Sequence, residues 1–344
     1  MKIFALVLVG WVLSYPTAAA AQTGPNAVYN SGGTCCASST AFIDASVFHS
    51  QKPDFCGVLN YILNPQDHVF SGGVIDARGL NPTNTSMTCS ASPWAGISSP
   101  PAATILLPAT GGGTTPTPIV IPSGWVLPPG THLIGVADGD VATSSGASYS
   151  GTTIQACKSG QKGCSAAFSG TMISFCSANC SGVSVENLNL DGKGQTGVNG
   201  ITNTNAGIST IAATSYVKNV TLFQIVGTGL TVSGNAQGSG PYSNITFDTN
   251  DSVSSSTVCL NVTASATQGF HRITCTSLYT APAAVLLDAS NTSLTDVRIT
   301  GFQDGILVGS RSTAHSDVLR NVWGDTGFAI GPATAFVRTS HVDG

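Results

Sequence analysis

Residues 187 to 191 read Asn187-Leu188-Asn189-Leu190-Asp191, and this polar-apolar-any-apolar-any frame returns five more times in the second half of the chain. The six copies begin at positions 187, 219, 244, 272, 296 and 321, so successive copies are 32, 25, 28, 24 and 25 residues apart. The alternation predicts a strand in each copy, and a near-constant period of this size predicts a solenoid. The later copies are Asn219-Val220-Thr221-Leu222-Phe223, Asn244-Ile245-Thr246-Phe247-Asp248, Arg272-Ile273-Thr274-Cys275-Thr276, Asp296-Val297-Arg298-Ile299-Thr300 and Asn321-Val322-Trp323-Gly324-Asp325.

A second, shorter apolar stretch follows most copies, at residues 200–201, 229–232, 284–287, 305–308 and 328–330. Two or three strands in each repeat describe one coil of a β-helix, and a single coil has too few inward side chains to form a core without its neighbours. We therefore predict an all-β fold, a right-handed parallel β-helix, with the handedness taken from the strong preference of parallel crossovers. The residues expected to form one continuous inward ladder are Leu188, Val220, Ile245, Ile273, Val297 and Val322.

The two ends of the chain differ from the repeat. Residues 1–21 combine Lys2, an apolar run and four alanines before Gln22, which predicts a secretory signal peptide. The run is too short to span a membrane and no later segment is long and apolar enough, so we expect a secreted protein, extracellular or periplasmic, with no membrane span. At the other end the pattern stops abruptly at Gly344, so we expect that the C-terminal end of the β-helix is truncated.

The N-terminal segment, residues 22–70, is expected to cap the β-helix. Phe55, Val58, Leu59, Tyr61 and Ile62 would share one face of a short helix, and such a helix would cover the exposed edge of the first coil. An irregular loop tied by disulfides is the alternative. The β-helix domain would then occupy residues 71–344, with a long Pro-, Gly-, Ser- and Thr-rich loop at about 81–118.

The composition narrows the classes of partner. Charged residues make up 8% of the 344 residues, Gly occurs 40 times, and the formal net charge is −4. The twelve Lys and Arg residues are scattered without a basic patch, so nucleic acid is not an expected partner. An acidic polymer stays possible, because a local groove can differ in charge from the chain as a whole.

Ten cysteines in an exported chain favour disulfides over metal or redox sites. The spacing suggests three local pairs, and the remaining four cysteines would tie the N-terminal segment together. The suggested pairs are Cys157 with Cys164, Cys176 with Cys180, and Cys259 with Cys275; the remaining four are Cys35, Cys36, Cys56 and Cys89.

Three early stretches add a family resemblance. Gly72-Gly73-Val74-Ile75-Asp76-Ala77-Arg78-Gly79 resembles the motif that opens the first strand in many pectate lyase-like proteins. Leu127-Pro128-Pro129-Gly130-Thr131-His132-Leu133-Ile134-Gly135 and Gly151-Thr152-Thr153-Ile154 look like the early coils of that superfamily. With the repeat, the resemblance covers residues 72–344. The resemblance is specific for the fold but says little about the activity, because lyases, hydrolases, esterases and adhesins share the same architecture.

The resemblance implies a protein that acts on polysaccharide, but it brings no intact catalytic signature. Of the four elements expected in a polygalacturonase-like glycosidase, only the first two residues of an Arg-Ile-Lys element are matched, at Arg272-Ile273 and at Arg298-Ile299. The expected function is lyase or hydrolase cleavage of an acidic, uronate-containing polymer. The alternative is a non-catalytic carbohydrate-binding or adhesin-type β-helix.

Candidate site residues come from the outward positions of the frame. The third and fifth positions should stack into two rows along one face, giving Asn189, Thr221, Thr246, Thr274, Arg298 and Trp323 in one row and Asp191, Phe223, Asp248, Thr276, Thr300 and Asp325 in the other. A sugar polymer needs aromatic platforms, amides and charged groups. The expected substrate-binding residues are Phe223, Trp323, Arg272 and Asn189.

Two chemistries are open on this face. Asp191 and Asp248, two coils apart at about 4.8 Å per coil, would lie about 9.5 Å from each other, at the upper edge of the separation of about 6.5 to 9.5 Å in inverting glycosidases. Alternatively, Asp248, Asn250 and Asp251 would bind Ca²⁺, with Arg298 or Arg272 as the base or substrate clamp of a lyase. Turn-forming or solvated roles are the structural alternative for these acidic residues.

Overall fold

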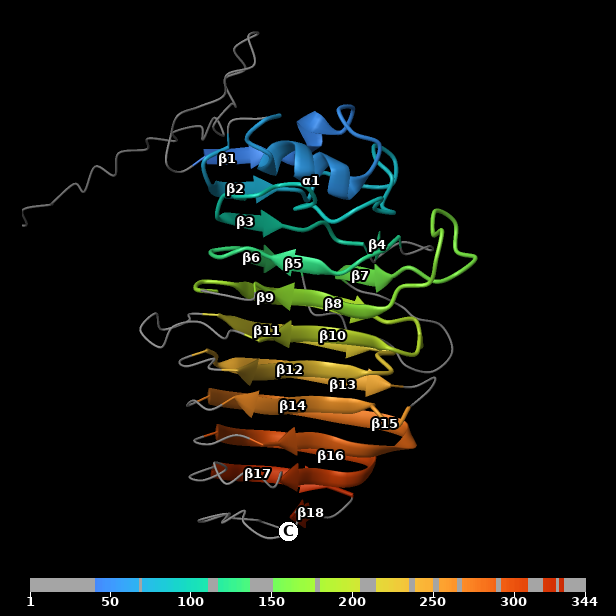
Figure 1. The fold of residues 1–344 in the computed structure, drawn as a ribbon, viewed down its shortest axis with the longest axis vertical. Coiled ribbons are helices and arrows are strands. Elements are labelled where there is room, and N and C mark those ends of the chain that lie inside the picture. The colour runs from blue at the N-terminus through green and yellow to red at the C-terminus, as the bar shows by residue number, and fades with distance from the viewer. Residues whose placement is uncertain are drawn as a thin grey trace, which may run out of the picture.

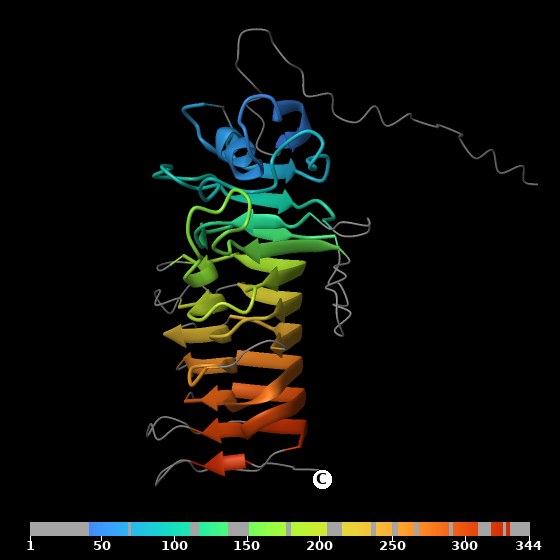
Figure 2. The same cartoon turned by 90° about the vertical axis from the view of Figure 1, so that its right-hand side faces the viewer.

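The structure is a parallel β-solenoid of about eight turns, stacked along the vertical axis of Figure 1. It is a computed structural model and describes residues 41–67, 70–110, 117–136, 151–176, 180–204, 215–234, 239–249, 254–264, 268–288, 292–308, 318–325 and 328–330. Figure 2, turned by 90°, shows the same stack of strands narrowing little from one end to the other. The all-β parallel fold predicted from the repeat is therefore confirmed.

Strand pairing follows three ladders, one for each strand segment of a coil. Ladder A joins β1 (Ala41–Asp44), β2 (Gly73–Asp76), β3 (Ala103–Leu106), β6 (His132–Ile134) and the first parts of β9 (Ser184–Asp191), β11 (Tyr216–Phe223), β13 (Tyr242–Thr249), β15 (Gln268–Leu287), β16 (Thr292–Val308) and β17 (Val318–Gly324). Ladder B joins β4 (Ile119–Ile121) and β7 (Thr152–Ala156) to the second parts of β9, β11, β13, β15, β16 and β17. Ladder C joins β5 (Trp125–Leu127), β8 (Gly170–Phe175), β10 (Val198–Asn203), β12 (Thr228–Gly234), β14 (Val258–Ala264), the ends of β15 and β16, and β18 (Phe328–Ile330).

The core is built as the repeat predicts. The second residue of each frame pairs with the second residue of the next along ladder B, and all six are buried. These residues are Leu188, Val220, Ile245, Ile273, Val297 and Val322. Ladder C repeats the arrangement with Ile201, Leu230, Leu260, Val285 and Ile306. Each coil therefore buries its apolar side chains against the coils above and below it, which is how a solenoid is stabilised.

The first residue of the frame forms the corner between ladders A and B. Every one of these residues has a left-handed backbone, with φ between 50° and 57°. Asn and Asp tolerate this conformation better than other side chains, which explains the polar first position. The six corner residues are Asn187, Asn219, Asn244, Arg272, Asp296 and Asn321.

The N-terminal segment contains the short cap predicted from sequence. Helix α1 (Phe55–Leu63) follows the 3-10 turn η1 (Ala45–Phe48) and lies above the first coils in Figure 1. Asp54 caps α1 by accepting a hydrogen bond from the Gly57 amide at 2.8 Å. The residues of the expected apolar face are buried, apart from Tyr61, which is partly buried.

The opening turn after β2 has a structural role. Arg78 donates two hydrogen bonds to the Asp76 carboxylate, at 2.9 and 2.7 Å, and this pairing holds the pKa of Asp76 below its usual value. The following segment, expected to be a long loop over residues 81–118, contains strand β3 in ladder A. The alternating sequence of β3, Ala103-Thr104-Ile105-Leu106, is short and is flanked by prolines. The composition of the surrounding segment therefore predicted a loop instead of a strand.

Four disulfides lie in the described part of the chain. Cys157–Cys164, Cys176–Cys180 and Cys259–Cys275 are the three pairs expected from spacing, and Cys56–Cys89 ties α1 to the loop after β2. Cys35 and Cys36 lie outside the described residues. Within the described ranges, none of the helices has the length and apolar character needed to cross a bilayer.

Candidate functional site

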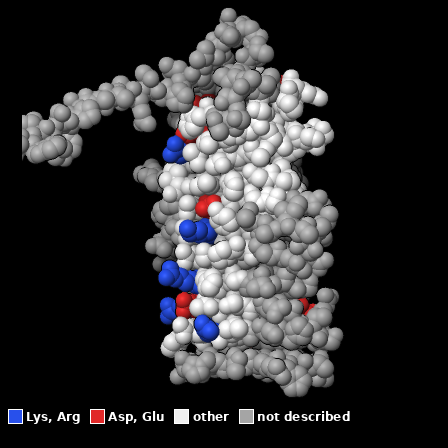
Figure 3. Space-filling view, turned by 90° about the vertical axis from the view of Figure 1, so that its left-hand side faces the viewer, with Lys and Arg blue, Asp and Glu red and all other residues white. Residues whose placement is uncertain are grey.

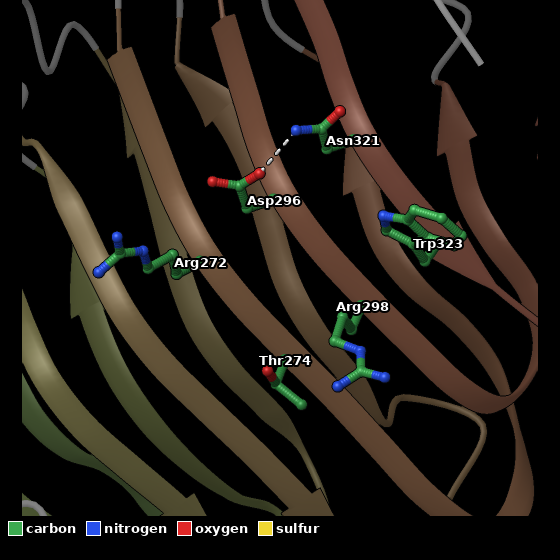
Figure 4. Close-up of a pocket in the computed structure, with 6 residues that line it drawn as sticks. All are labelled: Arg272, Thr274, Asp296, Arg298, Asn321 and Trp323. Atoms are coloured by element: carbon green, nitrogen blue, oxygen red, sulfur yellow. Dashed lines mark hydrogen bonds between the residues drawn. The ribbon is translucent and has the colours of Figure 1, made fainter. Parts of the chain in front are cut away.

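A pocket of about 560 Å³ lies on the outward side of the last coils, where ladder A turns into ladder B. Strands β15, β16 and β17 each contribute their corner residue and the third residue of the frame. The lining residues are Arg272, Thr274, Asp296, Arg298, Asn321 and Trp323, drawn in Figure 4. The pocket thus brings together Arg272 and Trp323, which were expected to bind substrate, and Arg298, which was expected as a base or substrate clamp.

Register fixes the spacing of these side chains. Thr274 pairs with Arg298, and Arg298 with Trp323, so the three form a row across adjacent strands about 4.8 Å apart. In Figure 4 Arg298 lies between Thr274 and Trp323. Along the corner, Asn321 Nδ2 donates to Asp296 Oδ1 at 3.0 Å. The pocket is therefore a rigid surface supported by three paired strands.

The two arginines supply the charge of the pocket. Arg272 and Arg298 are both exposed. Among the described residues, the basic partners in ion pairs are Lys52, Arg78 and Lys193, so neither arginine of the pocket forms an ion pair there. Figure 3 shows Lys and Arg at intervals along one side of the solenoid, with acidic groups among them. Guanidinium groups with this freedom are suited to bind carboxylates through paired hydrogen bonds.

Arg272 occupies a corner that favours a different side chain. In the earlier coils the corner amides form a chain: Asn219 Nδ2 donates to Asn187 Oδ1, and Asn244 Nδ2 donates to Asn219 Oδ1, both at 2.8 Å. Arg272 has the same left-handed φ of 55° without the compact amide that makes this conformation acceptable. Backbone strain of this kind, of order 1–3 kcal/mol, clusters at functional sites.

Trp323 provides the aromatic surface of the site. Trp323 is 58% exposed and lies near the end of β17. An exposed indole ring beside guanidinium groups offers a flat apolar face for a sugar ring and charge for the substituents of that ring.

The other expected site residues are not exposed, which corrects the sequence interpretation. Asn189 and Asp191 have no exposed surface, and Phe223 and Asp248 are also buried. Asp191 accepts hydrogen bonds from Gln155 Nε2 at 2.9 Å and from its neighbouring Lys193 amide at 2.8 Å. The frame predicts the outward direction of these side chains but not their burial.

The expected catalytic set is also not assembled. Asp191 and Asp248 are in one row of ladder B, two coils apart, as predicted, but a polymer in solvent has no access to them. Arg298 lies two coils beyond Asp248 and in the other row. We therefore do not retain this set as the catalytic centre.

The calcium hypothesis receives no support from the described residues. Asn250 and Asp251 lie outside them, so the arrangement around Asp248 is not defined. Within the described ranges, His, Cys, Asp and Glu side chains form no group of three suited to a metal ion.

The single glutamate of the chain belongs to a separate polar cluster on ladder A. Glu186 Oε1 accepts hydrogen bonds from Ser184 Oγ and Tyr216 Oη, each at 2.8 Å, and His132 Nδ1 lies 2.8 Å from Ser184 Oγ. Partial burial, followed by the bond to Glu186, raises the pKa of Tyr216. Glu186 is thus engaged by its own neighbours and is not a partner of the pocket arginines.

Three residues of the pocket were not singled out by the sequence interpretation: Thr274, Asp296 and Asn321. Thr274 was in the expected outward row. Asp296 and Asn321 occupy the first position of the frame, which becomes a solvent-facing corner only because its backbone is left-handed. The signal in the sequence that could have identified these two residues was the polar residue that recurs at the first position of each frame.

No protein-family model, curated protein or solved structure matches this chain. The resemblance to pectate lyase-like proteins therefore rests on the residues that carry it, and the repeat and its register establish the fold.

Proposed function

We propose that this protein is a secreted β-solenoid that binds an acidic, uronate-containing polysaccharide in the pocket formed by Arg272, Arg298 and Trp323. The observation that carries the proposal is the exposure of two arginines that form no ion pair with the described residues, beside an exposed Trp, on strands whose register fixes their spacing. Membership of the pectate lyase-like superfamily is part of this proposal, supported by the solenoid and the opening motif.

The charge of the pocket favours an anionic polymer. The pocket contains two guanidinium groups and one carboxylate, that of Asp296, and this carboxylate already accepts a hydrogen bond from Asn321. The local surplus of positive charge contrasts with the net charge of −4 of the chain. A neutral polysaccharide would gain the Trp323 contact alone, so uronates should bind more tightly than neutral glycans.

Cleavage of the bound polymer is the second candidate, favoured by the position of Asp296 among the arginines. In a β-elimination, a base removes the proton next to the uronate carboxylate, the electron pair forms a carbon–carbon double bond, and the neighbouring glycosidic C–O bond breaks. The departing oxygen takes a proton from water. Arg272 and Arg298 would neutralise the substrate carboxylate, and Asp296 would be the base.

A polysaccharide panel separates the two candidates. Purified protein is incubated with polygalacturonate, alginate and neutral glycans, with and without Ca²⁺. Saturable binding to the uronates without any product supports the binding function. Ultraviolet absorbance of an unsaturated uronate supports the lyase, and new reducing ends without that absorbance support a hydrolase. Equal binding to neutral and acidic polymers contradicts the proposal.

Matched variants assign the binding to the pocket. Arg298→Gln should weaken binding of polygalacturonate by roughly tenfold to a hundredfold, the usual effect of losing a charged hydrogen bond. Arg320→Gln is the control, because Arg320 is exposed on the neighbouring strand, β17, and lies outside the pocket lining. If both variants bind like the wild type, the pocket is not the site.

A further inference from the structure

A second pocket, of about 580 Å³, lies near the N-terminal end of ladder B, where five separate segments line it. The segments are the loop after β2, the first residues of β4 with the chain before it, strand β7, the loop closed by Cys157–Cys164, and the turn after β9. The lining residues are Pro82, Thr85, Ser86, Met87, Thr88, Thr117, Pro118, Val120, Gln155, Gln161, Lys162, Gly163 and Lys193. Its volume falls in the range of small-molecule sites.

A buried hydrogen-bond chain forms the back of this pocket. Gln161 Nε2 donates to Gln155 Oε1 at 2.9 Å, and Gln155 Nε2 donates to Asp191 Oδ2 at 2.9 Å. Gln155 is 4% exposed and Asp191 is fully buried. The polar groups are thus held in fixed positions before any ligand binds, which lowers the entropic cost of binding.

One buried hydroxyl of this pocket, that of Thr85, has no hydrogen-bond partner in the part of the chain that the structure describes. Thr85 is 8% exposed, lines the pocket, and its Oγ1 makes no hydrogen bond with the described part of the protein. A buried hydroxyl without a partner costs about 1–3 kcal/mol, so it calls for a specific explanation. A ligand hydroxyl in the pocket would supply the missing bond.

The charges of the pocket set the charge of the ligand. Lys162 is exposed, and Lys193 Nζ lies 3.8 Å from Asp191 Oδ2. Two ammonium groups less one carboxylate leave a single positive charge. Met87, Val120 and the two prolines supply apolar surface, as the ring faces of a sugar require.

We infer that this second pocket binds a monoanionic sugar residue, carboxylated or sulfated, with Lys162 and Lys193 facing the anion and Thr85 bonded to a ring hydroxyl. The site is distinct from the Arg272–Arg298–Trp323 pocket. Strand β7, which carries Gln155, and strand β16, which carries Arg298, are five strand steps apart along ladder B. At about 4.8 Å per step the two strands are about 24 Å apart, so no single sugar residue can fill both pockets.

The test uses the Arg298→Gln protein, in which binding at the first pocket is weakened. Digalacturonate, glucose 6-sulfate and glucose are titrated separately and followed by calorimetry. We expect saturable binding of one or both anionic sugars and none of glucose. Binding of digalacturonate alone identifies a carboxylate site, and binding of glucose 6-sulfate alone identifies a sulfate site.

Two further substitutions assign the binding to this pocket. Lys162→Gln should weaken it by roughly tenfold, as expected for one charged contact, whereas Lys158→Gln, in the same disulfide loop but outside the lining, should leave it unchanged. Thr85→Val should weaken binding without lowering the thermal midpoint, because the lost hydroxyl has no hydrogen-bond partner among the described residues. Binding of glucose equal to that of the anionic sugars, equal effects of the two lysine substitutions, or no binding of either anion would overturn the inference.

Discussion

Ladder B has a covered half and an open half, although both follow the same frame. In the covered half, on β9, β11 and β13, outward residues such as Asn189, Asp191 and Phe223 are buried. In the open half, on β15, β16 and β17, Arg298, Thr300 and Trp323 are exposed. The register is continuous across the boundary, so the difference lies in what covers each half. Where the coils are covered, outward side chains contribute to stability; where they are open, they are available to a ligand.

The corner residues show the same division. Asn187, Asn219 and Asn244 suit the left-handed backbone and bond to one another. Arg272 follows them at the start of the open half and ends this chain of amides. The covered half is thus optimised for stability at this corner, whereas the open half accepts strain at the position that lines the pocket.

The largest expected effect is that of removing a buried charge from the covered half. Asp191→Ala should lower the free energy of unfolding by about 3 kcal/mol, because it leaves Gln155 Nε2 and the Lys193 amide without their acceptor. Thr300→Ala, in the corresponding row of the open half, should change it by less than about 0.5 kcal/mol. Chemical denaturation measures both, and equal losses would contradict the division into halves.

A smaller effect is expected at the corner of the covered half. Asn219→Ala should cost about 2 kcal/mol, from two lost amide hydrogen bonds and the poorer fit of Ala to a φ of 53°. Asn219→Gly separates the two causes, since Gly accepts this backbone but forms no side-chain bond. If both variants are as stable as the wild type, the amide chain does not stabilise the corner.

The smallest effect on stability is expected in the open half. Trp323→Ala should leave the free energy of unfolding within about 0.5 kcal/mol of the wild type, because the ring is exposed. The same substitution should weaken polygalacturonate binding by roughly tenfold through the loss of the aromatic contact. Denaturation and binding assays on one preparation test both statements. A loss of stability as large as that of Asp191→Ala would show that Trp323 is a structural residue.

Much of the fold can be predicted from the sequence, because the inward positions of each strand alternate with outward ones and are mostly apolar in every copy of the frame. The period and the alternation identify the ladder from Leu188 to Val322, and the structure pairs these residues in the predicted register. Strand β3 was missed because four residues between proline-rich stretches carry little periodic signal. Cap helix α1 was found because its apolar face is long enough to show helical spacing.

The site was predictable only in part, since exposure depends on segments far away in the sequence. Arg272, Arg298 and Trp323 were identified from the frame and lie in one pocket. Asp191 fits the same frame but is buried, and it accepts a hydrogen bond from Gln155, its partner on β7, a strand that is not among the six copies of the frame. The role of Asp296 depended on a left-handed corner that the alternating pattern does not reveal.

The most direct test of the account is the affinity of the Arg272→Asn protein for polygalacturonate, measured beside its unfolding midpoint. The account predicts weaker binding by roughly tenfold, together with a gain of about 1 kcal/mol in stability, because Asn suits the corner and extends the amide chain from Asn244. Unchanged affinity, or a protein less stable than the wild type, would contradict the claim that this corner gives up stability in order to bind the polymer.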